Sequence, residues 1–208
     1  MHPNPIYRKT DAARSLAFAR DRGFGVLAIA AEGVPHLAHI PFLVSDDGGM
    51  AELHLVRSNP IARALKEPMP ARLDVLGPDG YVSPDWYGID DQVPTWNYVA
   101  VSFTGLLHPM PHDTLDSLLA RQSAAYEGRL LPKKPWTMDK LTEETHQRFL
   151  RSILPFRLEI TDIQSTWKLS QNKPDDARIG AAAHMPEGMG QGLEALAALM
   201  ADPPSPKD

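Results

Sequence analysis

The sequence predicts a mainly β fold with peripheral helices, of the α+β class, built on a small antiparallel barrel of six or more strands. Two observations predict this fold. Short runs rich in Val, Leu and Ile recur at close intervals, and clusters of Gly, Pro and Asp separate them, as in strands joined by turns. The connections are too short for crossover helices, so neighbouring strands are expected to be antiparallel.

A helix and three strands are expected in the first part of the chain. Thr10 or Asp11 can cap the helix, which ends at Arg22 because Gly23 follows. The three strands are expected at residues 24–31, 36–45 and 51–56, with turn chemistry at residues 32–35 and 46–49. Asn59 then caps a short helix that has Pro60 at its first position and ends near Lys66.

The second part of the chain alternates strands with a helical region. Strands are expected at residues 71–76, 99–107 and 156–163, and a long loop rich in Gly, Pro and aromatic residues at 77–92. Helical stretches at residues 113–126 and 139–153 form an insertion between barrel strands, at about 113–153. We expect one domain over residues 1–183, then a helical C-terminal segment at 184–208 whose last residues, 203–208, form a disordered tail.

Composition narrows the possible functions. The 208 residues, of which 43% are hydrophobic, suffice for a full core, and the absence of cysteine excludes disulfides and thiolate sites. No apolar run approaches the roughly 18–20 residues of a membrane span. The N-terminus lacks the basic and apolar regions of a signal peptide, so a cytoplasmic location is expected. The net charge of −5 and the scattered basic residues weigh against a dedicated nucleic-acid binder.

Two segments have the chemistry of a ligand site. The sequence Arg57-Ser58-Asn59-Pro60 ends a strand and begins a helix, where a cation, a hydroxyl and free amides could hold a phosphate. An ordinary capping turn with a surface arginine explains the same residues. The sequence Thr95-Trp96-Asn97-Tyr98 places two aromatic rings, an amide and a hydroxyl at the mouth of a strand, which suits a flat ring with a polar edge. Aromatic side chains packed in the core are the alternative.

Two later segments leave the same choice open. One segment is dense in hydrogen-bond donors: Lys168-Leu169-Ser170-Gln171-Asn172-Lys173. It could bind the edge of a ring or a phosphate, or it could be a solvated strand end. Tyr81 to Tyr87 forms a site lid or a packed loop. His36 and His39 fall on opposite faces of a strand, so they are poor joint ligands for one metal, and no metal site is expected. No GxGxxG, GxxxxGK[ST] or GxSxG motif occurs.

The order of these segments resembles the PaiB-type FMN-binding negative transcriptional regulators. The resemblance runs over about residues 1–180 and rests on four motifs in the same order: the segment from His54 through Arg57-Ser58-Asn59-Pro60, residues 81–87, residues 93–98, and residues 168–173. It implies a split β-barrel of the FMN-binding, pyridoxamine 5′-phosphate oxidase-like type. It also implies FMN as cofactor and a homodimer with the flavin at the subunit interface. The family usually opens with Met-Tyr, where this chain has Met1-His2.

The resemblance implies a set of cofactor-binding residues. Arg57, Ser58 and Asn59, which follow His54, match the segment that approaches the flavin phosphate. His39, Ile40 and Pro41 match a strand that lies beside the isoalloxazine ring. The remaining matches come from two segments: Thr95, Trp96, Asn97 and Tyr98, and Lys168, Ser170, Gln171 and Asn172.

Three functions fit these expectations. The resemblance implies a regulator, although the acidic charge and the lack of a recognisable helix-turn-helix weigh against direct DNA contact. A bound flavin would also suit an oxidoreductase acting on a small molecule, because the flavin carries the electrons and no acid–base triad is needed. A module that binds flavin without turnover is the third, so whether the protein is an enzyme stays open.

Overall fold

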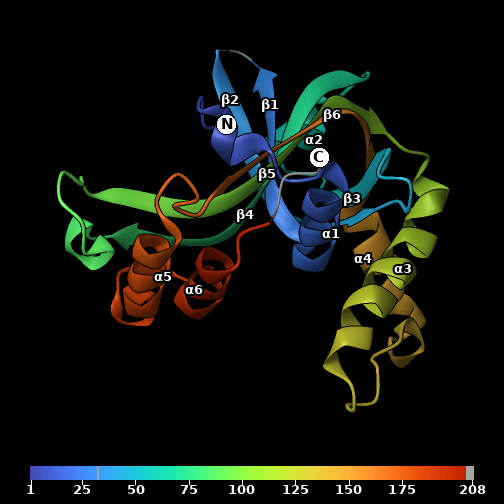
Figure 1. Cartoon of the computed structure of the whole chain (residues 1–208). Helices are drawn as coiled ribbons and strands as arrows, with labels where there is room; N and C mark the ends of the chain where they lie inside the picture. The colour runs from blue at the N-terminus through green and yellow to red at the C-terminus, as the bar shows by residue number, and fades with distance from the viewer. Residues whose placement is uncertain (32, 205–208) are drawn as a thin grey trace. The chain divides into compact units, whose positions relative to one another are not determined.

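The computed structural model describes residues 1–31 and 33–204, and the predicted tail falls partly outside this range, at residues 205–208. The chain divides into two compact units. Unit 1 comprises Met1–Arg22, Val75–Ser102 and Ile163–Asp208, and unit 2 comprises Gly23–Asp74 and Phe103–Asp162. Figure 1 shows the elements of both units along the chain.

Unit 2 contains the strand ring that the sequence predicts. Its strands are β1 (Phe24–Ala31), β2 (Val34–Val44), β3 (Met50–Val56) and parts of β4 (Met69–Val82), β5 (Thr95–Pro109) and β6 (Ile153–Lys168). The order is β1-β2-β3-β6-β5-β4, and β1 also pairs with β4, which closes the ring. Strand β1 pairs antiparallel with β2 and β4, and β3 pairs antiparallel with β2 and β6. For example, Leu27 faces Ala38 on one side and Leu73 on the other.

The core of unit 2 fills the inside of this ring. Alternate residues of β1 and β3 point inward, and Leu27 and Leu53 are fully buried. Phe42 and Phe103 meet edge to face, with ring centroids 6.5 Å apart. At Gly105 the backbones come so close that a Cβ atom would lie 1.8 Å from the carbonyl oxygen of Glu159. This position therefore requires glycine.

Three helices of unit 2 lie outside the strands: α2 (Pro60–Ala64), α3 (Leu115–Glu127) and α4 (Glu143–Ser152). Helix α3 buries Leu115 and Leu118, and it also makes polar contacts with the sheet. The hydroxyl of Tyr126 donates to the carbonyl oxygens of Gly23 (2.6 Å) and Phe42 (3.0 Å). Helix α3 is thus tied to β2 and to the residue before β1 by hydrogen bonds, in addition to its buried side chains.

Unit 1 has its own core, in which helices cover the remaining parts of β4, β5 and β6. Its helices are α1 (Ala12–Arg22), α5 (Asp175–His184) and α6 (Leu193–Ala201), and the short strand β7 (Gly190–Gln191) pairs with β4. Trp167, Leu169 and Met185 are buried in this core. Helices α5 and α6 pack against each other (Figure 1).

The sequence predicts the first three strands within two residues of their observed ends, but four later predictions are wrong. The strand predicted at residues 156–163 is part of the longer β6, Ile153–Lys168. β4 continues to Val82 through residues predicted as a loop, and β5 begins at Thr95, so the Thr95–Tyr98 run lies within a strand. Helix α4 begins at Glu143, because the Thr142 side chain caps it by accepting from the Thr145 amide. Single 3-10 turns occupy Pro5–Arg8, Pro84–Tyr87, His112–Thr114, Gly128–Leu130, Met138–Lys140 and Met185–Glu187.

Candidate functional site

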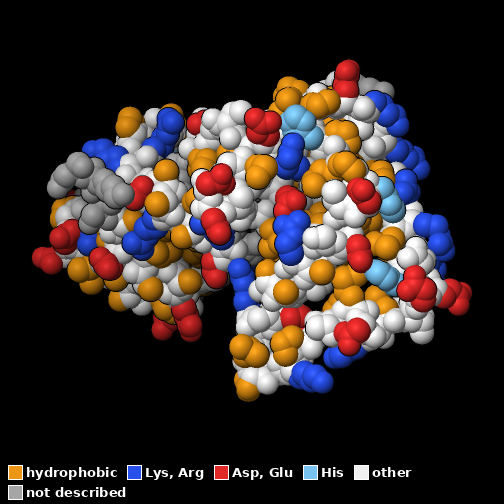
Figure 2. Space-filling model, turned by 90° about the vertical axis from the view of Figure 1, so that its right-hand side faces the viewer, with side chains coloured by type: hydrophobic (Ala, Val, Ile, Leu, Met, Phe, Trp, Pro, Cys, Tyr) orange, Lys and Arg blue, Asp and Glu red, His pale blue; other side chains and the backbone are white. Residues whose placement is uncertain are grey.

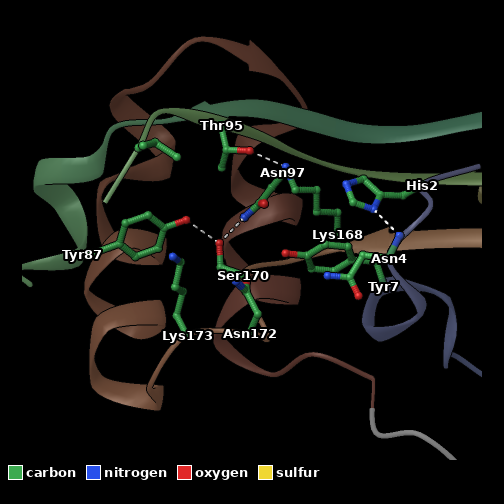
Figure 3. A pocket seen from close by; sticks show the side chains of 11 residues that line it. His2, Asn4, Tyr7, Tyr87, Thr95, Asn97, Lys168, Ser170, Asn172 and Lys173 are labelled. Atoms are coloured by element: carbon green, nitrogen blue, oxygen red, sulfur yellow. Dashed lines mark hydrogen bonds between the residues drawn. The ribbon is translucent and has the colours of Figure 1, made fainter. Parts of the chain in front are cut away.

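Unit 1 contains a polar cavity of about 250 Å³ at the start of β5 and the end of β6 (Figure 3). The N-terminal segment and the turn before α5 complete its wall. Five of the predicted site residues line it: Thr95, Asn97, Lys168, Ser170 and Asn172. The other lining residues are His2, Asn4, Tyr7, Tyr87, Val93 and Lys173.

A buried hydrogen-bond network forms the floor of the cavity. The Nδ2 of Asn97 donates to the Oγ of Ser170 (2.7 Å), and this hydroxyl also bonds to the hydroxyl of Tyr87 (2.7 Å), as Figure 3 shows. All three side chains are almost fully buried. The Oδ1 of Asn97 is buried and has no hydrogen-bond partner among the described residues. Such an acceptor is costly to leave unpaired, so it points to a missing donor.

Backbone geometry also singles out Ser170. Its φ of 62° lies in the left-handed region, which a residue other than glycine rarely adopts. The turn that contains it is held by the Gln171 side chain, whose Oε1 accepts from the Leu169 amide (2.7 Å) and whose Nε2 donates to the Trp167 carbonyl (2.5 Å). Strain of this kind persists where the surrounding structure determines it, and it is common at ligand sites.

Lys168 brings a half-buried cation to the cavity. Its ammonium donates to the Thr95 hydroxyl and to the Trp96 carbonyl oxygen (2.8 Å), and it lies 5.9 Å from the centre of the Tyr7 ring. Burial lowers the pKa of Lys168. Both hydrogen-bond acceptors are neutral, so neither offsets its charge.

Lys173 and His2 were not among the predicted site residues, yet both line the cavity. The Lys173 ammonium donates to the Gln92 side chain and lies 5.3 Å from the centre of the Tyr87 ring. Burial lowers the pKa of His2, with a smaller effect from the Lys168 charge. The many donors in the 168–173 segment could have indicated that Lys173 belongs to the site. Nothing in the sequence near His2 indicated that the N-terminus would lie beside residues 166 positions away along the chain.

Three predicted residues of unit 1 do not line the cavity. Trp96 is 43% exposed, and its ring meets that of Tyr81 edge to face at 6.5 Å. Tyr98 is half-buried, and Gln171 bonds to its own turn as described above. The alternation of side chains along a strand explains why Thr95 and Asn97 face one way and Trp96 the other.

The other predicted residues belong to unit 2. Ile40 is buried in its core, while His39 is exposed and Pro41 half-buried on the same strand, β2. The His54 Nδ1 bonds to Oε1 of Gln122 on α3 (3.0 Å), and Gln122 Nε2 in turn donates to the Pro41 carbonyl oxygen (3.4 Å). Burial lowers the pKa of His54, and the Gln122 bond opposes this effect. The contact with α3 occupies the Nδ1 atom of the His54 ring.

The Arg57–Asn59 segment has the structure of a helix cap. The Asn59 Oδ1 accepts from the Ile61 amide (2.9 Å), so this side chain serves the five-residue helix α2. Arg57 and Ser58 are exposed, and the Nε of Arg57 donates to the Arg151 carbonyl oxygen (2.6 Å). This bond orients the guanidinium.

The described residues contain no cluster of three or more His, Cys, Asp or Glu side chains arranged to hold a metal ion. None of the helices between residues 1 and 204 is long and apolar enough to cross a membrane. On the face drawn in Figure 2, basic and acidic side chains are interspersed.

Comparisons with known proteins agree with this fold. Residues 1–162 match a protein family described as "Putative FMN-binding domain". The chain is 28% identical over 204 residues to "Protease synthase and sporulation protein PAI 2" of Bacillus subtilis, which covers 97% of each chain. The family match ends before Lys168, whereas the similarity to PAI 2 runs through nearly the whole length.

Solved structures show a similar fold at low sequence identity. One is the FAD and heme binding protein from Mycobacterium smegmatis (TM-score 0.57, 20% identity, 88% of this chain and 82% of that one). Another is the flavocytochrome Anf3 from Azotobacter vinelandii (TM-score 0.56, 12% identity, 85% and 77%). The family match covers most of the chain, and unit 2 contains a closed ring of strands. The chain therefore belongs to the PaiB-type family of FMN-binding split-barrel proteins.

Proposed function

We propose that this FMN-binding protein is a PaiB-type negative transcriptional regulator that acts as a cytoplasmic homodimer, with the flavin at the subunit interface. The observation that carries the proposal is the unit 1 cavity, which brings together five residues that the family resemblance associates with the cofactor. The similarity to PAI 2 along the whole chain supports the regulatory role, because that protein is named for protease synthesis and sporulation.

The chemistry of the cavity suits part of an FMN molecule. A phosphate is bound by cations and hydroxyls, and the polar edge of a flavin ring is bound by amides and hydroxyls. The lining offers Lys168 and Lys173, the Thr95 hydroxyl and the Asn172 amide, and the Asn97 Oδ1 awaits a donor. Its volume of about 250 Å³ is below the roughly 300–1,000 Å³ of sites for drug-sized ligands, so it has room for one part of the cofactor.

Apart from the cavity, we propose that the unit 2 residues which the family resemblance associates with the cofactor also contact FMN. Arg57 and Ser58 are exposed and available to a phosphate, and Asn59 holds their turn in place. His39 and Pro41 would contact the ring from β2, with Ile40 contributing only its backbone because its side chain is buried. His54 would position Pro41 through Gln122.

Visible absorbance tests the cofactor part of the proposal. The purified protein should carry flavin absorbance, or, after removal of flavin, it should bind added FMN with quenching of flavin fluorescence. Sedimentation of the loaded protein should give a dimer. A monomer that binds FMN fully would contradict the interface location while leaving flavin binding intact.

Gel mobility shift tests the regulatory part. Because charge-driven DNA binding weakens steeply with salt, the assay uses the DNA upstream of the protein's own gene at about 50 mM salt, with and without FMN. A shift that depends on the flavin state supports a direct regulator. With no shift in either state, direct DNA binding is wrong, and regulation would have to act through another protein.

An oxidoreductase is the second candidate function. The cavity favours it because the Tyr87 hydroxyl and the Lys168 ammonium, which line it, can exchange protons. FMN, when bound, supplies electron transfer. The chain would bind and orient the reactant, with the Tyr87 hydroxyl and the Lys168 ammonium as groups that hold protons; burial raises the pKa of Tyr87 and lowers that of Lys168. Anaerobic mixing with NADH or NADPH should bleach the flavin if this candidate holds. Flavin that binds but is neither reduced nor linked to DNA binding would indicate a binding module without turnover.

A further inference from the structure

The cavity of unit 1 has an unbalanced charge. Its lining carries the Lys168 and Lys173 ammonium groups, and none of its eleven lining residues is Asp or Glu. Figure 3 shows the two lysines on opposite sides of Ser170, with His2 beyond Lys168. A protein with net charge −5 thus has a local concentration of positive charge at one concave site.

Neither lysine has a counter-ion in the described part of the chain. Lys168 bonds to the Thr95 hydroxyl and the Trp96 carbonyl oxygen, and Lys173 to the Gln92 side chain. These acceptors are neutral dipoles. Partly buried cations lose hydration, and an anion beside them would offset that loss.

The floor of the cavity contains an acceptor that needs a hydrogen-bond donor, whereas the lysines need an acceptor. The Asn97 Oδ1 is buried and unpaired, while its Nδ2 is held by Ser170. An apolar ligand would leave this acceptor unpaired. A cationic ligand would add to the positive charge of the two lysines. A ligand that carries an O–H or N–H donor beside a negatively charged oxygen would satisfy both the acceptor and the lysines.

We propose that this cavity binds a small oxyanion, a phosphate or carboxylate group with a hydrogen-bond donor beside it, through the ammonium groups of Lys168 and Lys173. The volume of about 250 Å³ fits a ligand smaller than a drug-sized molecule. Two sources have this chemistry: the phosphate of FMN, and a separate small acid that is a substrate or effector. Only the first source rests on the proposed flavin function.

Calorimetric titration of the flavin-free and FMN-loaded protein tests the proposal with four probes: FMN, riboflavin, inorganic phosphate and acetate. The variants are Lys168→Met and Lys173→Met, with Lys66→Met as the control because Lys66 is exposed and lies in unit 2. Lys168→Arg keeps the charge and should retain binding. Thermal unfolding of each variant shows whether it is folded.

The two sources give different results. If the cavity holds the FMN phosphate, Lys168→Met weakens FMN binding by about tenfold or more and leaves riboflavin binding unchanged, since one charge-assisted bond is lost. If it holds a separate acid, the FMN-loaded protein still binds phosphate or acetate, and the Lys168 and Lys173 variants lose that binding. The proposal is overturned if folded Lys168→Met and Lys173→Met match Lys66→Met with all four probes, or if they weaken FMN and riboflavin equally.

A failure of the proposed function remains distinguishable. If neither flavin binds but phosphate or acetate binds in a lysine-dependent way, the oxyanion site stands and the proposed flavin function is wrong. If FMN binds but no variant of the two lysines affects any probe, FMN binding stands and the oxyanion site is wrong.

Discussion

The Nδ2 of Asn97 donates a 2.7 Å hydrogen bond to the Oγ of Ser170, which ties the start of β5 to the turn after β6. The same hydroxyl bonds to Tyr87, so one buried oxygen joins three segments of unit 1. The network holds the floor of the cavity in a fixed arrangement. Its loss should therefore affect stability as well as ligand binding.

Ser170→Ala tests this network. Removing the hydroxyl leaves the Asn97 Nδ2 and the Tyr87 hydroxyl without their partner in a buried site, so the free energy of unfolding should fall by about 1–3 kcal/mol. Urea unfolding measures the change. Ser117→Ala, on the exposed side of α3, is the matched control and should change stability by less than about 0.5 kcal/mol. Equal effects of the two variants would show that the network does not stabilise unit 1.

Gly105→Ala tests the close approach of β5 and β6. A Cβ atom there would lie 1.8 Å from the Glu159 carbonyl oxygen, so the strands must separate, and we expect a loss of more than about 3 kcal/mol. Gly128→Ala is the counterpart, because a Cβ at Gly128 meets nothing within 4 Å and its φ is −60°. It should stabilise by about 0.4–1 kcal/mol, through the lower entropy of the unfolded chain. A mild effect of Gly105→Ala in denaturant unfolding would contradict the observed strand contact.

His54 should make stability depend on pH. Burial lowers its pKa, so between its folded pKa and its ordinary value of about 6.5 the unfolded chain binds more protons. The free energy of unfolding should therefore fall as the pH drops below about 6.5, until the folded pKa is passed. His54→Gln should flatten this part of the profile, whereas His39→Gln, which removes an exposed imidazole, should not. Parallel profiles for wild type and His54→Gln would contradict the prediction.

Tyr126→Phe tests how the helical insertion is held. It deletes the two hydrogen bonds to the Gly23 and Phe42 carbonyl oxygens, and burial raises the pKa of this phenol. We expect a loss of about 1–2 kcal/mol in the free energy of unfolding and faster hydrogen exchange of the α3 amides. Unchanged exchange in α3 would mean that its other contacts, such as those of Leu115, Leu118 and Gln122, hold the helix without the Tyr126 hydroxyl.

Local patterns predict much of this fold, because the turns of unit 2 are made by residues next to one another. Asn59 caps α2 as its sequence context indicates, and the strand ends at Ala31 and Val56 follow from adjacent turn residues. The extension of β4 is different. Gly77 and Gly80 have the composition of a loop, yet Phe18 and Met185, distant in sequence, pack over them and favour a strand.

The cavity could be predicted only in part for the same reason. Thr95, Asn97, Lys168 and Ser170 belong to segments whose composition already indicated a site. His2 and Tyr7 reach the cavity because Thr166 accepts from the His2 amide (3.0 Å), a contact between residues 164 positions apart. Trp96 was predicted because it is aromatic, but the alternation of the strand turns it away from the cavity.

Equilibrium titration with FMN tests the central claim most directly, when the wild type is compared with Asn172→Trp. Asn172 is exposed and lines the cavity, so a tryptophan there should fill it without disturbing the core. Gln147→Trp, on the exposed surface of α4, is the control. The proposed site predicts that wild type and Gln147→Trp bind FMN equally and that Asn172→Trp, still folded, binds it at least about tenfold more weakly. Equal FMN affinity of all three proteins would contradict the claim that the unit 1 cavity holds part of the cofactor.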